Sequence, residues 1–378
     1  MMTDGLRTWI EVDKVAIQDN FNIFRSHIDS GTALGAVVKS NAYGHDFRQF
    51  SQEVINCGID WLIVDSIVEA LALRKEGISI PILVLGYTLP ERISQAAEKG
   101  ISITVSTFDL LEAVIQEMEK GGVAPKIHIK VDTGMTRHGF FEKDRDLLLK
   151  TLKKHKGELH IEGLFTHFSA AKNPVLPHFT NTQIERFTEW KNAFEDGGFS
   201  PLCHTAATGG ALLFPESHFD LVRIGIGMYG LWPSQEAKAH LEEDLTLTPA
   251  LSWKTIVGEV KNVPVGTRVG YDGTEVLSHD ATLAICPVGY WHGFSRKLSG
   301  IGHVLIRGKR ARVVGRVSMD IITVDVTDIP GTSMGDEVVL IGEQGDEKIT
   351  AYEMASLDDT SWYETITRIN PLIKRIYV

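Results

Sequence analysis

The chain has 378 residues, of which 43% are hydrophobic and 23% charged, a composition typical of a globular protein. Its formal net charge of −11 and the lack of a basic tract argue against a nucleic-acid-binding role. Three cysteines without paired spacing argue against a disulfide scaffold, and no apolar run approaches the ~20 residues of a membrane helix. The first residues do not resemble a signal peptide, so we expect a cytoplasmic protein without a membrane partner.

Short apolar runs typical of buried strands recur through the first 225 residues. They cover residues 33–38, 61–64, 80–85, 101–105, 127–131, 159–165, 202–207 and 221–226. Segments with helical spacing lie between most of them; at residues 106–122, Ser106 and Asp109 are expected to form a capping box. Eight strands alternating with helices predict a (β/α)8 barrel of the TIM type, with an open doubly wound sheet as the alternative.

The pattern changes after about residue 240. Residues 250–261 alternate as one strand, and turn residues separate further strand-like runs. These runs cover residues 281–285, 302–306, 313–317, 321–326 and 337–340. We therefore expect an α/β chain with the barrel at residues 14–240 and a β-rich C-terminal domain at 245–378, to which a strand within residues 1–13 is added.

Lys39 is the most informative residue, because it ends the first apolar run of the predicted barrel. A lysine at the tip of a buried strand is expected to have a desolvated amine, which makes it a usable nucleophile toward a carbonyl. Tyr43 follows four residues later, just before a glycine, and its hydroxyl can reach the same place. A lysine that merely marks a strand end and faces water is the alternative.

Further residues capable of chemistry fall at the predicted strand ends, where barrel enzymes keep their active sites. They are Lys130, Arg137, His167, His204, Thr208 and Arg223. Each has a structural alternative, such as a core histidine or an arginine paired with a carboxylate. Their joint occurrence at one end of the barrel favours an active site.

Seven segments in chain order resemble the motifs of the alanine racemases, which use pyridoxal phosphate. They lie at residues 36–45, 130–139, 166–168 with 204–208, 223–230, 270–274, 315–320 and 362–364. The resemblance spans the whole chain. It implies an isomerase that interconverts L- and D-alanine, supplies D-alanine for peptidoglycan and works as a homodimer with shared active sites.

The resemblance also implies a role for each matching residue. Lys39 holds pyridoxal phosphate as an imine and serves one face of the substrate, and Tyr271 from the other subunit serves the opposite face. Arg223 faces the pyridine nitrogen, so the ring stays largely unprotonated and transamination is suppressed. The expected cofactor-binding residues are Lys39, Tyr43, His167, His204, Thr208, Arg223, the backbone N–H groups of Gly225 and Ile226, and Tyr363.

Substrate binding is assigned in the same way. Arg137 and the Met319 backbone are implied to bind the substrate carboxylate, and Lys130 is a possible site of carbamylation. No metal is expected.

The sequence departs from the family pattern near the expected active-site entrance. Trp291 and His292 replace the usual Ala-Asp, and Ser361 replaces an apolar residue. These changes keep a broader-range or serine-preferring racemase open as an alternative. A decarboxylase of basic amino acids with the same barrel places an acid at the pyridine nitrogen, which Arg223 argues against, and single-domain barrel proteins that only bind the cofactor lack Tyr271.

Overall fold

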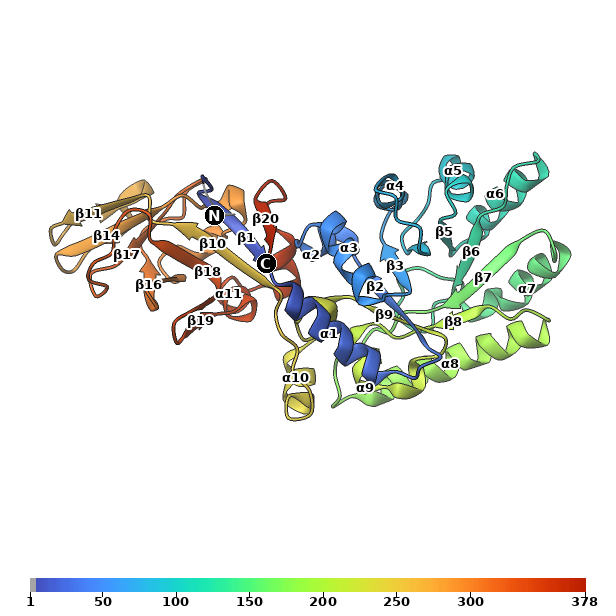
Figure 1. The fold of residues 1–378 in the computed structure, drawn as a ribbon. Helices are drawn as coiled ribbons and strands as arrows, with labels where there is room; N and C mark the ends of the chain where they lie inside the picture. The colour runs from blue at the N-terminus through green and yellow to red at the C-terminus, as the bar shows by residue number, and fades with distance from the viewer. Residues whose placement is uncertain (1–4) are drawn as a thin grey trace. The chain divides into compact units, whose positions relative to one another are not determined.

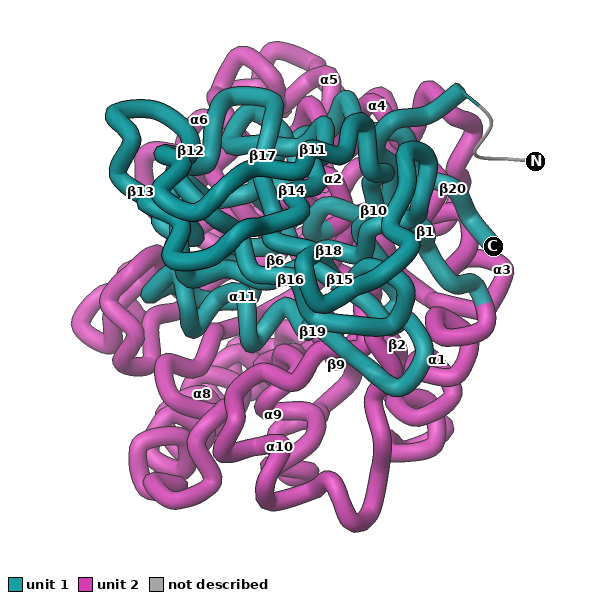
Figure 2. The backbone as a smooth tube through the Cα atoms, turned by 90° about the vertical axis from the view of Figure 1, so that its left-hand side faces the viewer, with its two compact units in different colours: residues 1–14, 43–46, 250–378 teal, residues 15–42, 47–249 magenta. Residues whose placement is uncertain are grey.

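The structure is a computed structural model that describes residues 5–378, so the first four residues of the predicted N-terminal strand segment lie outside it. The chain divides into two compact units (Figure 2). The first, the barrel unit, comprises residues 15–42 and 47–249; the second, the β-rich unit, comprises residues 1–14, 43–46 and 250–378. Across the described residues, every helix is too short or too polar to span a membrane.

The barrel unit contains eight parallel strands, as the sequence predicts (Figure 1). They are β2 Ala33–Val37, β3 Trp61–Val64, β4 Ile82–Val84, β5 Ser102–Val105, β6 Lys126–Lys130, β7 His160–Phe165, β8 Leu202–His204 and β9 Leu221–Ile224. Each strand pairs with the next, and β9 returns to β2. A parallel bridge between Ala207 and Arg223 joins the two ends of the sheet and closes the barrel.

Helices follow most of these strands, which is why the strands are buried on both faces and read as continuous apolar runs. The helices are α1 Lys14–His27, α3 Phe47–Cys57, α4 Ile67–Lys75, α5 Ile93–Glu98, α6 Phe108–Glu119, α7 Arg145–Lys154, α8 Pro177–Asp196, α9 Thr208–Leu213 and α10 Gln235–Leu241. Short 3₁₀ turns lie at Pro90–Arg92, Glu142–Asp144, Pro215–Ser217 and Ile226–Tyr229.

The predicted start of α6 is wrong by one residue. Thr107, not Ser106, is the N-cap, and its hydroxyl accepts a hydrogen bond from the N–H of Leu110. Ser106 is buried at the end of the chain segment that leaves β5, so its side chain is not placed to cap the helix. The capping box with Asp109 therefore does not form.

The β-rich unit is built on a mostly antiparallel sheet in the order β11-β14-β17-β16-β15-β18-β10-β1-β20, with β19 paired to β18. Its strands are β1 Thr8–Val12, β10 Leu251–Ile256, β11 Glu259–Val263, β14 Ala281–Cys286, β15 His303–Ile306, β16 Lys309–Val313, β17 Ile322–Asp325, β18 Glu337–Gln344, β19 Glu347–Ile349 and β20 Lys374–Tyr377. Short elements complete it: β12 Arg268–Val269, β13 Glu275–Val276, α11 Ala351–Leu357, α12 Trp362–Thr367 and 3₁₀ turns at Tyr271–Gly273, Tyr290–His292 and Arg296–Leu298. The N-terminal strand β1 pairs antiparallel with β10 and parallel with β20.

Two strand predictions in this unit are wrong. Residues 250–261 form two strands, because the N–H of Val257 bonds to Asp336 while that of Gly258 bonds to Ile285, so the chain changes partner at this point. Only Val313 of the predicted strand 313–317 lies in a strand, as the last residue of β16, which begins at Lys309. The charged residues of β16 obscured its strand pattern, and Gly315 with φ +71° turns the chain away after Val313.

Candidate active site at the mouth of the barrel

Lys39 directly follows the buried run that includes β2, at the carboxyl end of the barrel strands. The next four residues, Ser40 to Tyr43, all have φ between +49° and +57°, so the chain makes a left-handed turn, α2 Lys39–Tyr43. None of them is glycine, and left-handed backbone costs about 1 kcal/mol or more per non-glycine residue. Strain of this kind concentrates at functional sites, where the surrounding structure maintains it.

A carboxylate from the next βα unit holds this turn in place. Glu69 Oε1 accepts the N–H of Ser40 at 2.7 Å, while its Oε2 accepts the N–H groups of Asp65 at 2.9 Å and Ser66 at 3.1 Å. Ser66 and Glu69 also form the capping box of α4. One glutamate therefore starts a helix and fixes the backbone beside Lys39, a role that sequence reasoning missed although the Ser-x-x-Glu pattern is visible.

The expectation that Lys39 is desolvated is wrong. Its side chain is 34% exposed, and Nζ lies 3.3 Å from Asp65 Oδ1. The physical reason is that β2 ends before Lys39 and the left-handed turn carries the residue out of the strand layers. The amine is accessible and is held at the mouth of the barrel by Asp65.

Arg223 is the most buried cation of the site, at 1% exposed, and it lies on β9. Nη1 donates to His204 Nδ1 at 2.6 Å, and Nη2 donates to the carbonyls of Thr166 at 2.9 Å and Thr205 at 2.8 Å. No carboxylate of the described residues comes within ion-pair distance of it. Burial, with a smaller contribution from nearby Arg137, lowers the pKa of the Arg223 guanidinium to about 9.

Arg223 also fixes the histidines that the sequence places here. Nη2 lies 3.4 Å from His167 Nδ1. Because an arginine only donates, the facing nitrogen of each ring must accept, and a neutral ring then carries its proton on Nε2. Burial lowers the pKa of both His167 and His204 well below the ordinary value, and the charge of Arg223 adds to this, so both rings are neutral.

Lys130 ends β6 and is 5% exposed. Among the described residues its amine has no ion-pair partner; Nζ lies 5.4 Å from the centre of the Phe165 ring. Burial lowers the pKa of Lys130 to about 8, with Arg137 and Arg223 contributing next. A much larger fraction of this amine than of an ordinary lysine is therefore neutral near physiological pH, as reaction with carbon dioxide requires.

Thr208 begins α9, and its hydroxyl is the meeting point of two backbone donors. Oγ1 accepts the N–H of Gly225 at 3.1 Å and of Gly227 at 3.3 Å. Both glycines belong to the turn after β9, where the 3₁₀ segment Ile226–Tyr229 opens. A larger residue at Gly227 would have to displace the buried Phe24 ring, because an added Cβ would lie 2.4 Å from it. The predicted Thr208 hydroxyl and Gly225 N–H thus come together, with the N–H of Gly227 as an additional donor.

The other predicted site residues belong to the β-rich unit. Tyr43 and Tyr363 lie together there, with ring centres 6.4 Å apart, and burial raises the pKa of Tyr363. Tyr271 is 68% exposed on a 3₁₀ turn, and Met319 is 53% exposed. Ser361 caps α12, since its hydroxyl accepts the N–H of Tyr363. This substitution therefore supports the helix that carries Tyr363.

The site chemistry suits an anionic, phosphorylated aromatic cofactor. Arg223 Nε makes no hydrogen bond within the described part of the chain, so this buried donor is left for a ring nitrogen. Thr208 and the adjacent backbone N–H groups can serve a phosphate, and Lys39 offers an accessible amine for a carbonyl carbon. The fold and site together define the class of barrel enzymes that use pyridoxal phosphate.

Comparisons with known proteins narrow this class. The family model "Alanine racemase, N-terminal domain" matches residues 12–233, and "Alanine racemase, C-terminal domain" matches residues 250–377. Alanine racemase of Symbiobacterium thermophilum is 39% identical over 100% of this chain and 99% of its own length. Alanine racemase 2 of Oceanobacillus iheyensis is 38% identical over 98% and 93%, respectively.

Solved structures agree. The Bacillus anthracis alanine racemase with bound L-Ala-P is 38% identical, with a TM-score of 0.92 over 98% of this chain and 95% of that one. The Bartonella henselae alanine racemase, which carries covalently bound pyridoxal phosphate, is 25% identical, with a TM-score of 0.87 over 98% and 99%. The chain belongs to the alanine racemase family, and the predicted barrel followed by a β-rich domain is confirmed.

Proposed function

We propose that this protein interconverts L- and D-alanine with pyridoxal phosphate as cofactor. The observation that carries the proposal is Arg223, a buried cation on β9 with its Nε donor free and no carboxylate beside it. A permanent donor opposite the ring nitrogen limits how much charge the ring can take, which favours proton exchange at the substrate Cα over transamination. An acid at this position, as a decarboxylase would have, is absent from the described residues around Arg223.

The cofactor, when bound, supplies the electron-withdrawing ring that acidifies the substrate Cα–H. We assign Lys39 to its covalent attachment and Arg223 to its ring nitrogen. Its phosphate is assigned to the Thr208 hydroxyl and the backbone N–H groups of Gly225 and Ile226, together with Tyr43 and Tyr363. The hydrogen bond from the Gly225 N–H to Thr208 Oγ1 supports the part of this assignment that rests on Thr208, because it uses the oxygen as an acceptor and leaves the O–H to be donated to a phosphate.

Two bases are needed to invert Cα. Lys39 Nζ exchanges the proton on one face, and Tyr271 Oη exchanges it on the other. A tyrosine hydroxyl ordinarily has a pKa near ~10 and is a poor base at neutral pH. We assign His167 to lower this barrier: Nδ1 faces Arg223, so Nε2 carries a proton that can be donated to the oxygen of Tyr271.

Substrate orientation is assigned to Arg137 and the Met319 backbone, which bind the carboxylate. We propose that Lys130 becomes a carbamate, which converts a buried unpaired cation into an anion among Arg137 and Arg223. The neutral amine adds to carbon dioxide and releases one proton. A mass increase of one carbon dioxide on the peptide containing Lys130, lost on acidification, tests this step.

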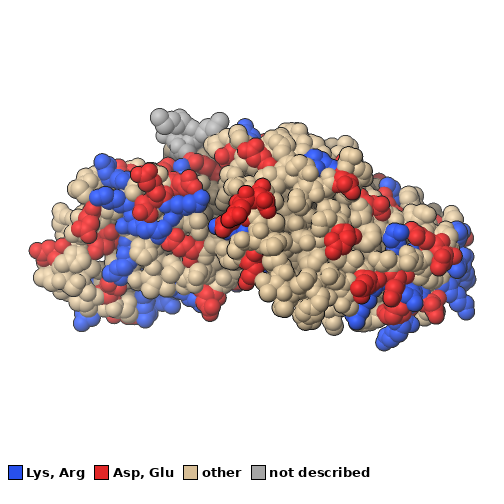
Figure 3. Space-filling model, turned by 90° about the horizontal axis from the view of Figure 1, so that it is seen from below, with Lys and Arg blue, Asp and Glu red and all other residues tan. Residues whose placement is uncertain are grey.

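The wider context follows from the family. We propose a cytoplasmic homodimer that supplies D-alanine for peptidoglycan, with each site combining Lys39 of one subunit and Tyr271 of the other. Figure 3 shows one face on which basic and acidic side chains are interspersed, without a dominant field of either sign.

The decisive experiment incubates the purified holoenzyme with L-alanine in deuterated water and resolves the product on a chiral column. D-Alanine carrying deuterium at Cα, formed faster than D-serine, D-lysine or D-arginine in parallel reactions, supports the proposal. A cofactor-loaded protein that forms no D-product from any of these substrates overturns it.

The shared-site assignment has its own test. Lys39→Ala and Tyr271→Phe are each expected to be inactive, but mixed after dissociation and reassociation they form heterodimers with one intact site. Random pairing predicts about one quarter of the wild-type activity. If both residues of a site come from one chain, the mixture stays inactive.

Trp291 supports a second candidate, a racemase of broader range. Its side chain is 57% exposed, whereas the neighbouring His292 is largely buried and its Nδ1 accepts the N–H of Gly289. Trp291 is therefore available to a substrate, while His292 maintains its own turn. A changed serine-to-alanine rate ratio in Trp291→Ala, but not in His292→Asn, would favour this candidate.

A further inference from the structure

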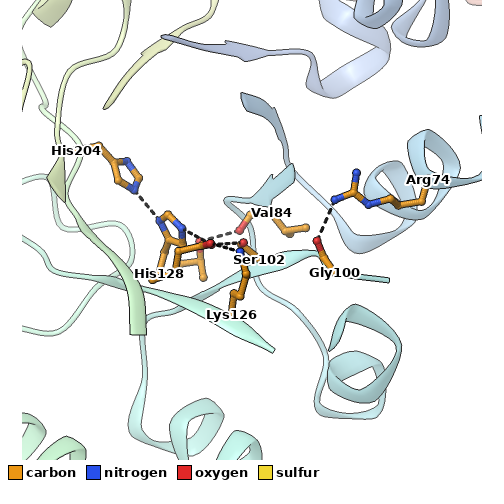
Figure 4. A network of polar contacts seen from close by, with 9 residues as sticks. Arg74, Val84, Gly100, Ser102, Lys126, His128 and His204 are labelled. Atoms are coloured by element: carbon orange, nitrogen blue, oxygen red, sulfur yellow. Dashed lines mark hydrogen bonds and ion pairs between the residues drawn. The ribbon is translucent and has the colours of Figure 1, made fainter. Parts of the chain in front are cut away.

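The barrel interior contains a series of polar contacts that the assigned reaction does not use. His204 Nε2 lies 2.8 Å from His128 Nδ1 (Figure 4). His128 Nε2 in turn lies 3.2 Å from Glu162 Oε2. Lys126 Nζ donates to Glu162 Oε1 at 2.6 Å, and the Ser102 hydroxyl donates to Oε2. The series runs from Arg223 near the mouth to the amino ends of β5 and β6.

The donors and acceptors in this series have only one consistent order. Arg223 can only donate, so His204 Nδ1 accepts and its proton is on Nε2. His204 Nε2–H then donates to His128 Nδ1, which leaves the His128 proton on Nε2. That proton is donated to the Glu162 carboxylate, which can only accept while ionised. A cation at one end and an anion at the other therefore fix both tautomers between them.

The local structure is built for this contact. Gly163 and Phe165 of β7 face the barrel interior. If side chains alternated strictly along this strand, Glu162, next to Gly163, would face outward. The register between β6 and β7 shifts at this point: Ile127 opposes Ile161 but His128 opposes Gly163, which leaves Glu162 as the extra residue of a bulge. Bulges re-aim side chains in this way.

Glycine 163 makes room for the imidazole. A Cβ at this position would lie 2.1 Å from His128 Nδ1, the atom that receives the hydrogen bond from His204. Aromatic packing fixes the second ring, since His204 stacks on Phe165 with centres 4.6 Å apart and planes 7° from parallel. Neither ring can rotate without displacing a neighbour.

We propose that Glu162, acting through His128 and His204, is a positioning residue for Arg223. The ordered hydrogen bonds keep the guanidinium oriented toward the mouth, and they link it to the negative charge of the Glu162 carboxylate. Glu162 touches neither substrate nor cofactor. The effect on catalysis rests on the proposed function, but the hydrogen-bond order does not.

Histidine-selective ¹⁵N NMR of the holoenzyme tests the order without substrate. The expected result is that His128 and His204, assigned by their loss in His128→Asn and His204→Asn, are both neutral with the proton on Nε2. A proton on Nδ1 of either ring, or a charged ring, overturns the proposal. The tautomers are read in the wild-type protein, and the two asparagine variants serve only to assign the resonances.

Variants then test the link to Arg223. Glu162→Leu removes the acceptor and is expected to change the His204 resonances, to shift the cofactor absorbance and to lower the racemisation rate several-fold relative to transamination. Glu162→Gln keeps an acceptor and should restore the tautomers and part of the rate. Glu158→Gln, which removes an exposed glutamate paired with His155 at 3.1 Å, is the matched control.

A double-mutant cycle separates a connected series from independent packing effects. If the series acts as a unit, Glu162→Leu combined with His128→Asn is no worse than the poorer single variant. Additive losses, or unchanged His204 resonances in Glu162→Leu, contradict the proposal. A wild-type protein without racemase activity but with the expected tautomers would overturn the proposed function alone.

Discussion

The two ends of the barrel differ in whether their buried charged side chains have partners of opposite charge. At the mouth, Lys130 and Arg223 are nearly fully buried, yet neither has an ion-pair partner among the described residues. Near the amino ends of the strands, Glu162 receives hydrogen bonds from His128, Lys126 and Ser102. Buried polar groups that are fully paired stabilise a fold, whereas unpaired buried cations destabilise it.

This difference indicates which end serves a ligand. Cations without an ion-pair partner leave their charge available to an anionic cofactor and substrate, at the expense of the stability of the free protein. The paired end needs no ligand to be stable. Substitutions at the mouth should therefore change activity most, and substitutions at the other end should change stability and orientation.

The largest effect is expected for Lys39→Ala. Losing both the covalent attachment and one of two bases should lower the rate of racemisation by at least ~10³-fold, measured by chiral analysis. Lys99→Ala, at an exposed position, serves as the control for loss of a lysine. Substantial racemisation by a Lys39→Ala protein that retains its circular dichroism spectrum would remove Lys39 from its role.

Arg223→Glu should have the second largest effect, with a loss of about 10²-fold in the rate of racemisation and a rise in transamination relative to racemisation. A carboxylate cannot donate to His204 Nδ1, so the ring must change its tautomer, move or gain a proton, and the donor facing the cofactor nitrogen is lost. Arg223→Lys keeps a donor and a charge and should lose less. An unchanged ratio of the two reactions in Arg223→Glu contradicts the assignment.

The sequence predicts the mouth better than the interior. All eight barrel strands are recognisable because each lies in a short, largely apolar run, and Lys130, His204 and Arg223 stand out as polar residues within or just after such runs. Glu162 was missed because its inward direction depends on a bulge, which strand periodicity does not reveal. His128 carried a signal that was not used: it alternates with Lys126 and Lys130 along one face of β6.

The exposure of Lys39 could not be predicted either. Four successive left-handed residues follow it, and no glycine among them announces the turn. Glu69 stabilises the first of these residues from a neighbouring βα unit, a contact between residues 29 positions apart. Local propensity contains no information about such a contact.

Lys130→Met should raise the stability of the free protein while lowering its activity. The pKa of Lys130 is about 8 in the folded state against 10.5 ordinarily, so folding disfavours the charged amine. The penalty is complete below about 8 and disappears as pH rises toward 10.5. We expect a gain of about 1–3 kcal/mol in the free energy of unfolding near pH ~7, measured by denaturant titration.

Carbon dioxide sharpens this prediction. If Lys130 forms a carbamate, the wild-type protein loses its unpaired cation in bicarbonate buffer, and the advantage of Lys130→Met should shrink there. Lys150→Met, on the surface helix α7, should show no difference between the buffers. An advantage that is the same with and without bicarbonate argues against carbamylation.

Glu162→Gln should have the smallest effect on stability, and its pH dependence identifies the cause. Burial raises the pKa of Glu162, but hydrogen bonds from His128, Lys126 and Ser102 outweigh burial and bring it to about 2. A carboxyl with a lowered pKa stabilises the fold above its ordinary value of 4.5, and this contribution is lost as pH falls toward about 2. Near pH ~7 the variant should lose about 1–2 kcal/mol in the free energy of unfolding, because glutamine keeps the shape and an acceptor but not the charge.

Urea denaturation of the wild type, Glu162→Gln and the control Glu158→Gln, compared between pH ~7 and the acidic range in which Glu162 protonates, distinguishes the effect of charge from that of packing. If the ionised carboxylate is what the amino end of the barrel requires, the deficit of Glu162→Gln narrows as the wild-type residue protonates. A deficit that is equal at every pH would mean that shape alone matters at this position. In that case the pairing of charges at the amino end of the barrel would not explain why the bulge in β7 turns a glutamate, rather than a neutral residue of the same shape, inward.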